Sequence, residues 1–249
     1  PSAGRWLAAG LALGLATSAV APCAALAPVF AVAAWVSGGA SLRPRAARVA
    51  ALGAGVCLVV LPIVAHNASA AGRWAGLATS DGVNFYIGNS TAWCEALAVQ
   101  PGLDWDRLVR RPFEQGAGSE VEASRWFRAR ALREMEEDPA AAVRRCLLKA
   151  EVFWHGREIP RNIDLYGWRG TSRLLSASVW HAGLYFPVGL LVPLAAVGMV
   201  AARRRRAVLF LGAAMLAFGL LVALFFPCSR YRVPVLPPLV VLAAVGAEA

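Results

Sequence analysis

Residues 207–226, AVLFLGAAMLAFGLLVALFF, form a run of 20 residues without a charged side chain. As an α-helix, a run of this length can cross the roughly 30 Å hydrocarbon core of a bilayer. The residues immediately before it, 203–206, are all arginine. Short basic connections of this kind stay on the cytoplasmic side of a membrane. The stretch 203–226 therefore predicts a transmembrane helix that starts at the cytoplasmic face.

Two further apolar runs, at 46–65 and 182–202, are as long and carry charge only at their ends, and a shorter run at 233–247 begins with Pro234, Pro237 and Pro238 and predicts a spanning helix with an irregular start. Hydrophobic residues make up 58% of the chain and charged residues only 16%, against roughly a quarter charged in soluble domains. This composition excludes an ordinary water-soluble globule. We therefore predict a mainly α protein, a polytopic bundle of transmembrane helices that carries a helical loop domain outside the cytoplasm.

The placement of charge gives the expected topology. Residues 66–181 hold 15 of the 25 basic and 14 of the 15 acidic side chains, so the remainder holds 10 basic residues and one acidic residue and carries nearly all of the net charge of +10. That surplus flanks the apolar runs, which disfavours a nucleic-acid-binding role. The basic connectors at 43–48 and 203–206 both place residues 66–181 outside. Transmembrane helices are expected in 1–65 and, three in number, in 182–249.

The first 36 residues leave two alternatives open. The apolar stretch 6–36 is long for one span and short for two, and Pro22 and Pro28 interrupt it. It is either a broken pair of short helices that meet near residues 17–22 or one kinked helix. Pro1 stands where a complete protein has methionine, and no signal peptide is recognisable, so we expect the chain to be part of a longer protein.

Within the loop, local signals predict a helical hairpin over about 119–155. The first helix starts at the capping box of residues 119–122, and the second at Asp138-Pro139. The stretch 73–118 is rich in turn residues and is expected to be loop, with a short strand-like run at 83–87. The apolar faces expected on the two helices are Val121, Trp126, Ala129, Leu132 and Met135, and Val143, Cys146, Leu147, Ala150 and Trp154.

Cysteine and histidine are too few and too scattered to indicate a metal site or a disulfide framework. Cys94 and Cys146 could pair in an oxidising compartment, and this alternative stays open. The other cysteines lie in or beside apolar runs, where a thiol behaves as a small hydrophobe.

Three stretches combine polar and aromatic residues in ways that suit ligand binding. They are DGVNFYIGNS at 81–90, KAEVFWHGREIPRNID at 149–164, and RYRVP at 230–234. Aromatic faces with amides and carboxylates suit a sugar, and a guanidinium binds phosphate oxygens in bidentate fashion. Each stretch also has a purely structural interpretation, as a turn, an interfacial helix end and arginines that reach to lipid headgroups.

Taken together, NFYIGN at 84–89, Lys149 before FW at 153–154, EIPRN at 158–162 and RYRVP at 230–234 resemble the later half of bacterial GT-C glycosyltransferases. The resemblance is to relatives of protein O-mannosyltransferases and of the aminoarabinose transferase of lipid A, and it covers most of the chain. It implies transfer of a sugar from a polyprenyl-phosphate donor to a lipid, glycan or protein acceptor at the outer face of the bacterial inner membrane.

The resemblance also implies roles for particular residues. Arg230, Arg232 and Lys149 would bind the donor phosphate, and the catalytic carboxylate would lie upstream of Pro1. No organic cofactor is implied, and participation of a divalent cation is left open. The segment GLATSAVAP at 14–22 lacks the cation that the family carries between its paired helices. The substrate-cleft residues implied are Asn84, Tyr86, Asn89, Glu158 and Asn162.

A different class of function stays open beside this one. A non-catalytic membrane protein, such as a transporter subunit or an envelope assembly factor, would use the loop to dock a partner. A transporter would be expected to show internal repeats, and none is apparent in the sequence.

Overall fold

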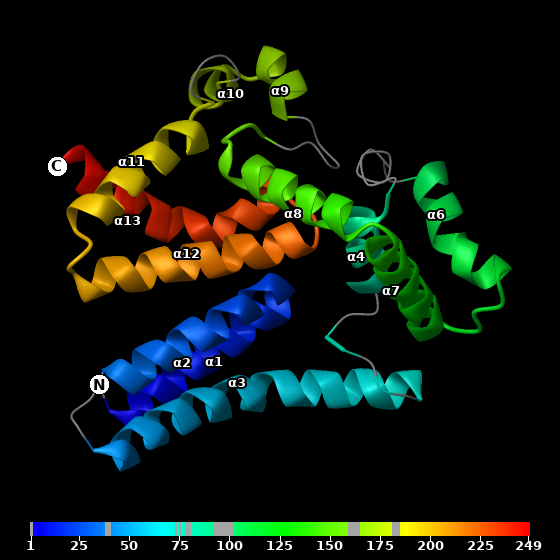
Figure 1. Ribbon diagram of the computed structural model, residues 1–249, viewed down its shortest axis with the longest axis horizontal. Helices are drawn as coiled ribbons and strands as arrows, with labels where there is room; N and C mark the ends of the chain where they lie inside the picture. The colour runs from blue at the N-terminus through cyan, green and yellow to red at the C-terminus, as the bar shows by residue number, and fades with distance from the viewer. Residues whose placement is uncertain are drawn as a thin grey trace. The chain divides into compact units, whose positions relative to one another are not determined.

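The computed structural model describes residues 2–37, 41–72, 74, 76–77, 81–91, 102–158, 165–180 and 185–249. In these residues all regular structure is helical, which confirms the mainly α prediction. The chain forms two compact units (Figure 1). The first unit comprises Pro1–Thr79 with Leu216–Phe218, and the second comprises Ser80–Met215 with Gly219–Ala249.

The first unit contains three apolar helices. They are α1 (Ala3–Ala19), α2 (Leu26–Val36) and α3 (Leu42–Ala71), and the short 3₁₀ helix η1 (Ala21–Ala25) separates α1 from α2. Of the two alternatives for the N-terminal stretch, the structure therefore has the broken pair. Gly10 of α1 and Gly55 of α3 face each other so closely that a methyl group on either would overlap backbone of the other helix. Small residues at such positions let membrane helices approach closely.

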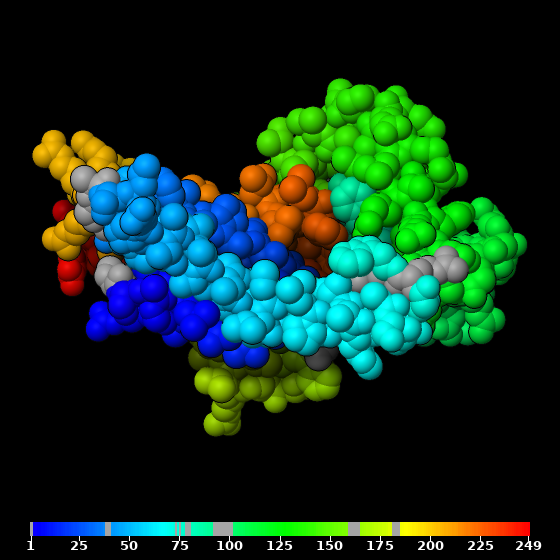
Figure 2. Space-filling model, turned by 90° about the horizontal axis from the view of Figure 1, so that it is seen from below, coloured from blue at the N-terminus to red at the C-terminus, as the bar shows by residue number. Residues whose placement is uncertain are grey.

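The helix α3 is longer than the predicted run 46–65. It continues past His66 to Ala71 and ends at Gly72, whose φ of 63° is the left-handed conformation of a helix C-cap. Leu58 and Leu61 are 63% and 57% exposed, and Figure 2 shows one face of α3, in blue to cyan, open along its length. An apolar surface of this kind suits lipid rather than water.

The second unit holds the apolar helices α11 (Val188–Ala201) and α13 (Leu236–Ala247), and α12 (Arg206–Leu224) apart from Leu216–Phe218. The 3₁₀ helix η3 (Ser229–Val235) leads directly into α13. Three helices among the described residues are long and apolar enough to cross a membrane: Leu42–Ala71, Arg206–Leu224 and the joined Ser229–Ala247. The predicted run 182–202 is represented by α11, which begins only at Val188 and falls short of that length.

The remaining helices of the second unit form the loop region between α3 and α11. They are α4 (Asp81–Asn89), α6 (Leu103–Glu114), α7 (Glu120–Glu137), α8 (Pro139–Trp154), α9 (Leu165–Trp168), η2 (Arg169–Thr171) and α10 (Arg173–Ser178). Local capping explains the hairpin of α7 and α8. Ser119 Oγ accepts the N–H of Glu122 at 3.3 Å, and Asp138 Oδ1 accepts the N–H of Ala141 at 2.9 Å.

The prediction of a strand-like run at 83–87 in an otherwise irregular stretch was wrong, because α4 and α6 occupy parts of it. Val83, Tyr86 and Ile87 are buried, a spacing that belongs to a helix rather than to a strand. They pack in one apolar cluster with Leu108 of α6 and Phe127 of α7. Burial of this face stabilises a segment whose aromatic and β-branched residues would otherwise favour a strand.

Close contact between α4 and α7 depends on Gly82. A methyl group at this position would overlap the carbonyl oxygen of Ser124. The Ser124 hydroxyl donates to Asp81 Oδ1 at 2.7 Å and accepts the N–H of Gly82 at 3.1 Å, while Arg128 forms an ion pair with Asp81. The start of α4 is thus fixed to the middle of α7.

The apolar face predicted for α8 was also wrong, and the one predicted for α7 was correct only at Val121, which is buried, and at Trp126, which packs against the apolar cluster. In α8, Val143 and Leu147 are 60% and 66% exposed. In α7, Leu132 is 43% exposed, and Ala129 is exposed as well. The residues that these two helices bury are Val121, Ala123, Ser124, Phe127, Ala131 and Glu134 in α7, and Ala142, Arg145, Lys149 and Phe153 in α8. The buried face of α8 thus carries two cations, and polar partners from other segments determine its orientation.

Candidate functional site

Lys149 lies at the centre of a buried polar cluster that joins three segments of the second unit. Its side chain is 0% exposed, and its Nζ donates to Asn89 Oδ1 and to the carbonyl oxygen of Phe225, both at 2.9 Å. Asn89 ends α4, Lys149 belongs to α8, and Phe225 follows α12. The contact therefore joins residues that are far apart in sequence.

Asn89 completes this connection. Its Nδ2 donates to Phe85 O at 3.0 Å within α4 and to Leu224 O at 2.8 Å at the end of α12. The last carbonyl groups of a helix have no partner inside the helix and carry its partial negative charge. The amide and the ammonium together satisfy two of these groups at the end of α12.

A glycine makes this close approach possible. A methyl group on Gly88 would overlap the carbonyl oxygen of Phe225. Because the neighbouring Asn89 binds the same turn, Gly88 lets α4 lie directly against the chain that leaves α12. The sequence NFYIGN therefore has a structural role in which its glycine and its last asparagine act together.

Burial changes the protonation chemistry of Lys149. Its pKa is lowered from 10.5 to about 8, chiefly because removal from water disfavours the charged ammonium. Cys146 acts in the opposite direction, and the positive charge of Arg145 lowers the pKa further. No carboxylate among the described residues forms an ion pair with Lys149.

Arg232 of η3 is the second buried cation of this region, at 3% exposure. Its Nε donates to Phe153 O at 2.9 Å and its Nη2 to Val152 O at 2.7 Å, so it satisfies carbonyl groups in the last turn of α8. Its Nη1 lies 3.8 Å from Glu158 Oε1 and is buried without a hydrogen-bond partner. The guanidinium thus holds η3 against the end of α8.

The other residues implied by the resemblance lie in different environments. Arg230 is exposed, with its guanidinium carbon 5.2 Å from the centre of the Tyr231 ring. Tyr86 lies in the apolar cluster, 5.4 Å from the ring of Phe127. Asn84 is half-buried on α4. Two residues named in the sequence analysis, Asn162 and Cys94, lie outside the described residues.

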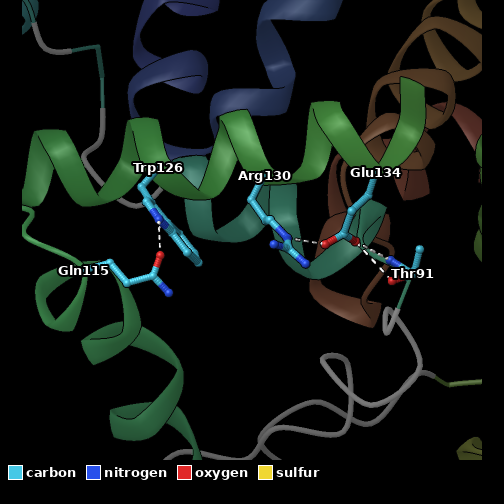
Figure 3. Close-up of polar contacts among 5 residues, drawn as sticks. All are labelled: Thr91, Gln115, Trp126, Arg130 and Glu134. Atoms are coloured by element: carbon cyan, nitrogen blue, oxygen red, sulfur yellow. Dashed lines mark hydrogen bonds and ion pairs between the residues drawn. The ribbon is translucent and has the colours of Figure 1, made fainter. Parts of the chain in front are cut away.

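A second polar group, on α7, holds the chain that follows α4 (Figure 3). Glu134 Oε2 accepts the N–H of Thr91 at 2.7 Å and its hydroxyl at 3.2 Å, and Oε1 pairs with Arg130 Nε at 2.7 Å. Burial alone would raise the pKa of Glu134, but the bonds from Thr91 and Arg130 outweigh it and lower the pKa. The carboxylate is therefore an ionised anchor.

Arg145 is the residue of this region that sequence reasoning missed. It lies on the buried face of α8, four residues before Lys149, and is 8% exposed. The available signal was the spacing, since positions four apart on a helix share one face. The apolar residues Val143 and Leu147 of α8 led to the wrong prediction, because they suggested that their own face is buried and that the basic face points to water. No group of His, Cys, Asp or Glu among the described residues could hold a metal ion.

The chain matches no protein-family model, no curated protein and no solved structure. The functional proposal therefore depends on the resemblance in the sequence motifs and on the chemistry of this cluster.

Proposed function

We propose that the chain is part of a membrane glycosyltransferase that transfers a sugar from a polyprenyl-phosphate donor to an acceptor at the outer face of the bacterial inner membrane. One observation carries the proposal. The three motif segments 84–89, 149–158 and 230–234 are joined by direct contacts, through Lys149 with Asn89 and through Arg232 with the end of α8. Motifs that serve one site are expected to meet in this way.

The charge of the cluster suits the proposed chemistry. When a sugar leaves a polyprenyl phosphate, the leaving group keeps its negative charge, and fixed cations near it stabilise the transition state. Lys149 and Arg232 are buried cations, and among the described residues the carboxylate that pairs with one of them is Glu158, 3.8 Å from Arg232. Glu158 with Asn84 supplies the polar side chains proposed for the sugar cleft.

The proposal divides the work among the three cations. Arg230 is exposed and can grip phosphate oxygens directly with its planar guanidinium. Arg232 and Lys149 donate most of their hydrogen bonds to carbonyl and amide oxygens of the protein, so they would act on the phosphate mainly through their positive electrostatic potential. The proposal assigns no catalytic base within this chain.

The proposed topology follows from the charge pattern. The helices α3, α12 and α13 would cross the membrane, and the apolar segment that contains α11 would return the chain from the outside to the cytoplasm. The arginines at 203–206 would then lie in the cytoplasm and the loop region on the outside. The cluster would then lie at the outer end of α12, where a membrane-embedded donor presents its phosphate.

The test is sugar transfer by the full-length protein carrying Arg230→Ala. With radiolabelled polyprenyl-phosphate hexoses as donors, we expect kcat/KM to fall about a hundredfold or more, in the range found when one transition-state donor is removed. Arg204→Ala removes another exposed guanidinium, from the basic connector, and serves as the control. Transfer that is unchanged in Arg230→Ala, with normal membrane insertion, would refute the role of Arg230.

A second function is favoured by the outer face of α8, where Val143 and Leu147 are exposed. A non-catalytic membrane protein could use this apolar surface to dock a partner. Absence of transfer with every donor tested, from a full-length protein that is folded and inserted, would favour this function over the enzyme.

A further inference from the structure

A stripe of positive charge runs along the buried face of α8. Arg145 and Lys149 lie one helical turn apart, about 6 Å along the axis, and are 8% and 0% exposed. Arg232 lies one turn further, at the carbonyl groups of Val152 and Phe153. Taking two or more cations out of water carries a large desolvation cost unless an anion accompanies them.

The described part of the chain does not supply that anion at Arg145. Glu158 approaches Arg232, but no ion pair is formed by Arg145 or by Lys149 among the described residues. Two of the nitrogens of Arg145, Nε and Nη2, are buried and have no hydrogen-bond partner. These two N–H groups lie on one edge of a planar guanidinium, which is the edge that grips an oxyanion in bidentate fashion.

Another unpartnered donor lies next to the same cluster. Ser90 is 0% exposed, and its Oγ is buried without a hydrogen-bond partner. It directly follows Asn89, whose amide accepts from Lys149 Nζ. Buried polar groups in native proteins are almost always satisfied, so the unpartnered donors of Arg145, on the same helix face as Lys149, indicate a ligand.

We infer that Arg145 and Lys149 form a binding site for a phosphate-class oxyanion, in which the Nε and Nη2 edge of Arg145 binds two oxygens and Lys149 supplies a second positive charge. A tetrahedral oxyanion has the charge and the oxygen spacing that this edge recognises. The same chemistry is offered by free phosphate and by the phosphate of a lipid. The inference concerns binding alone and does not require the proposed sugar transfer.

The experiment measures binding of inorganic [³²P]phosphate to the full chain by equilibrium dialysis at pH 7. Dodecyl maltoside is the detergent because it contains no phosphate. Arg145→Met removes the guanidinium and keeps much of the side-chain volume. Replacing buried charged groups by apolar residues of similar volume is often neutral or stabilising for the fold. Arg144→Met is the matched control, because Arg144 is the neighbouring residue of α8 and is exposed. Monodispersity and helix content establish that each variant is folded, and Arg145→Gln replaces Arg145→Met if the latter does not fold.

We expect Arg145→Met to lower the affinity for phosphate about tenfold to a hundredfold, as the loss of charged hydrogen bonds predicts, while Arg144→Met keeps the wild-type affinity. Competition with dodecyl phosphate identifies the source of the ligand. Stronger competition than by unlabelled phosphate assigns the site to a lipid-linked phosphate, and equal or weaker competition assigns it to a free oxyanion.

Two results would overturn the inference: failure of the wild-type chain to bind either probe, or equal affinity in Arg145→Met and wild type. Because the assay contains no sugar and requires no turnover, its failure is distinct from failure of the proposed transferase activity.

Discussion

Replacing Lys149 by methionine is expected to remove a specific pH dependence from the stability of the second unit. The folded-state pKa of Lys149 is about 8, against 10.5 for an ordinary lysine. Below pH 8 the amine is protonated in both the folded and the unfolded chain, so Lys149 does not make the free energy of unfolding depend on pH there. Between about pH 8 and 10.5 the unfolded chain binds a proton that the folded chain lacks, so the free energy of unfolding rises with pH.

The size of the effect follows from the gap between 10.5 and about 8. At about 1.4 kcal/mol per pKa unit, the wild type should gain about 3 kcal/mol of stability as the pH rises through this window. Both hydrogen bonds of Nζ can survive deprotonation, because a neutral amine still has two N–H groups for Asn89 Oδ1 and Phe225 O. The gain is therefore not offset by the loss of these contacts. Lys149→Met has no proton to lose and should lack the gain.

Two measurements check this prediction. The first is denaturant unfolding of wild type and Lys149→Met in detergent from pH 7 to pH 10.5, where the difference between the two curves isolates Lys149 from the tyrosines and cysteines. The second is direct, since Lys149 is the only lysine in the chain. A lysine-labelled sample therefore gives one side-chain NMR signal, whose shift with pH reports the pKa.

Parallel stability curves for the two proteins across this window would refute the reasoning, and so would an NMR titration near pH 10.5. Either result would mean that the ammonium is solvated in solution and that the buried cluster does not form as described.

Two further changes test the contacts around the cluster. Gly88→Ala should destabilise the protein by about 1–3 kcal/mol in denaturant unfolding, because the added methyl overlaps the Phe225 carbonyl; Gly170→Ala, where nothing lies within 4 Å, is the control, and equal effects of the two would contradict the packing. Arg232→Ala should cost about 3–5 kcal/mol and speed hydrogen exchange in the last turn of α8, whose carbonyl groups lose their donors. Arg230→Ala should leave that exchange unchanged, and a similar effect of both variants would show that Arg232 does not cap the helix.

Sequence reasoning succeeded where the deciding interactions are local. The charge-free run after Arg206 predicted α12 correctly, because a helix satisfies the backbone hydrogen bonds of a long apolar stretch within the stretch itself. The caps at Ser119 and Asp138 gave the starts of α7 and α8, because a capping side chain binds N–H groups only a few residues away. The break predicted near Pro22 lies between α1 and α2, because proline has no N–H and its ring disturbs the preceding turn of a helix, which is also a local effect.

Prediction from the sequence failed where contacts between distant segments determine the structure. The strand-like run at 83–87 is helical because its face packs against α6 and α7. Val143 and Leu147 are exposed because the opposite face of α8 is buried through Lys149, whose hydrogen-bond acceptors lie at the end of α4 and at the end of α12. Periodicity identified α8 as a helix but could not show which of its faces would be buried, because the partners lie 60 and 76 residues away in the sequence.

By itself, the sequence determined the helical class, the apolar helices and their caps, because hydrophobic length and hydrogen bonds to near neighbours are properties of short stretches. The tertiary structure alone decided that Arg145 and Lys149 face inward, with no ion pair to a carboxylate in the described part of the chain, and that Arg232 binds the carbonyl groups at the end of α8. Whether a cation is a solvated surface charge or part of an anion site depends on what surrounds it, and those surroundings are assembled only when α4, α8 and the end of α12 meet.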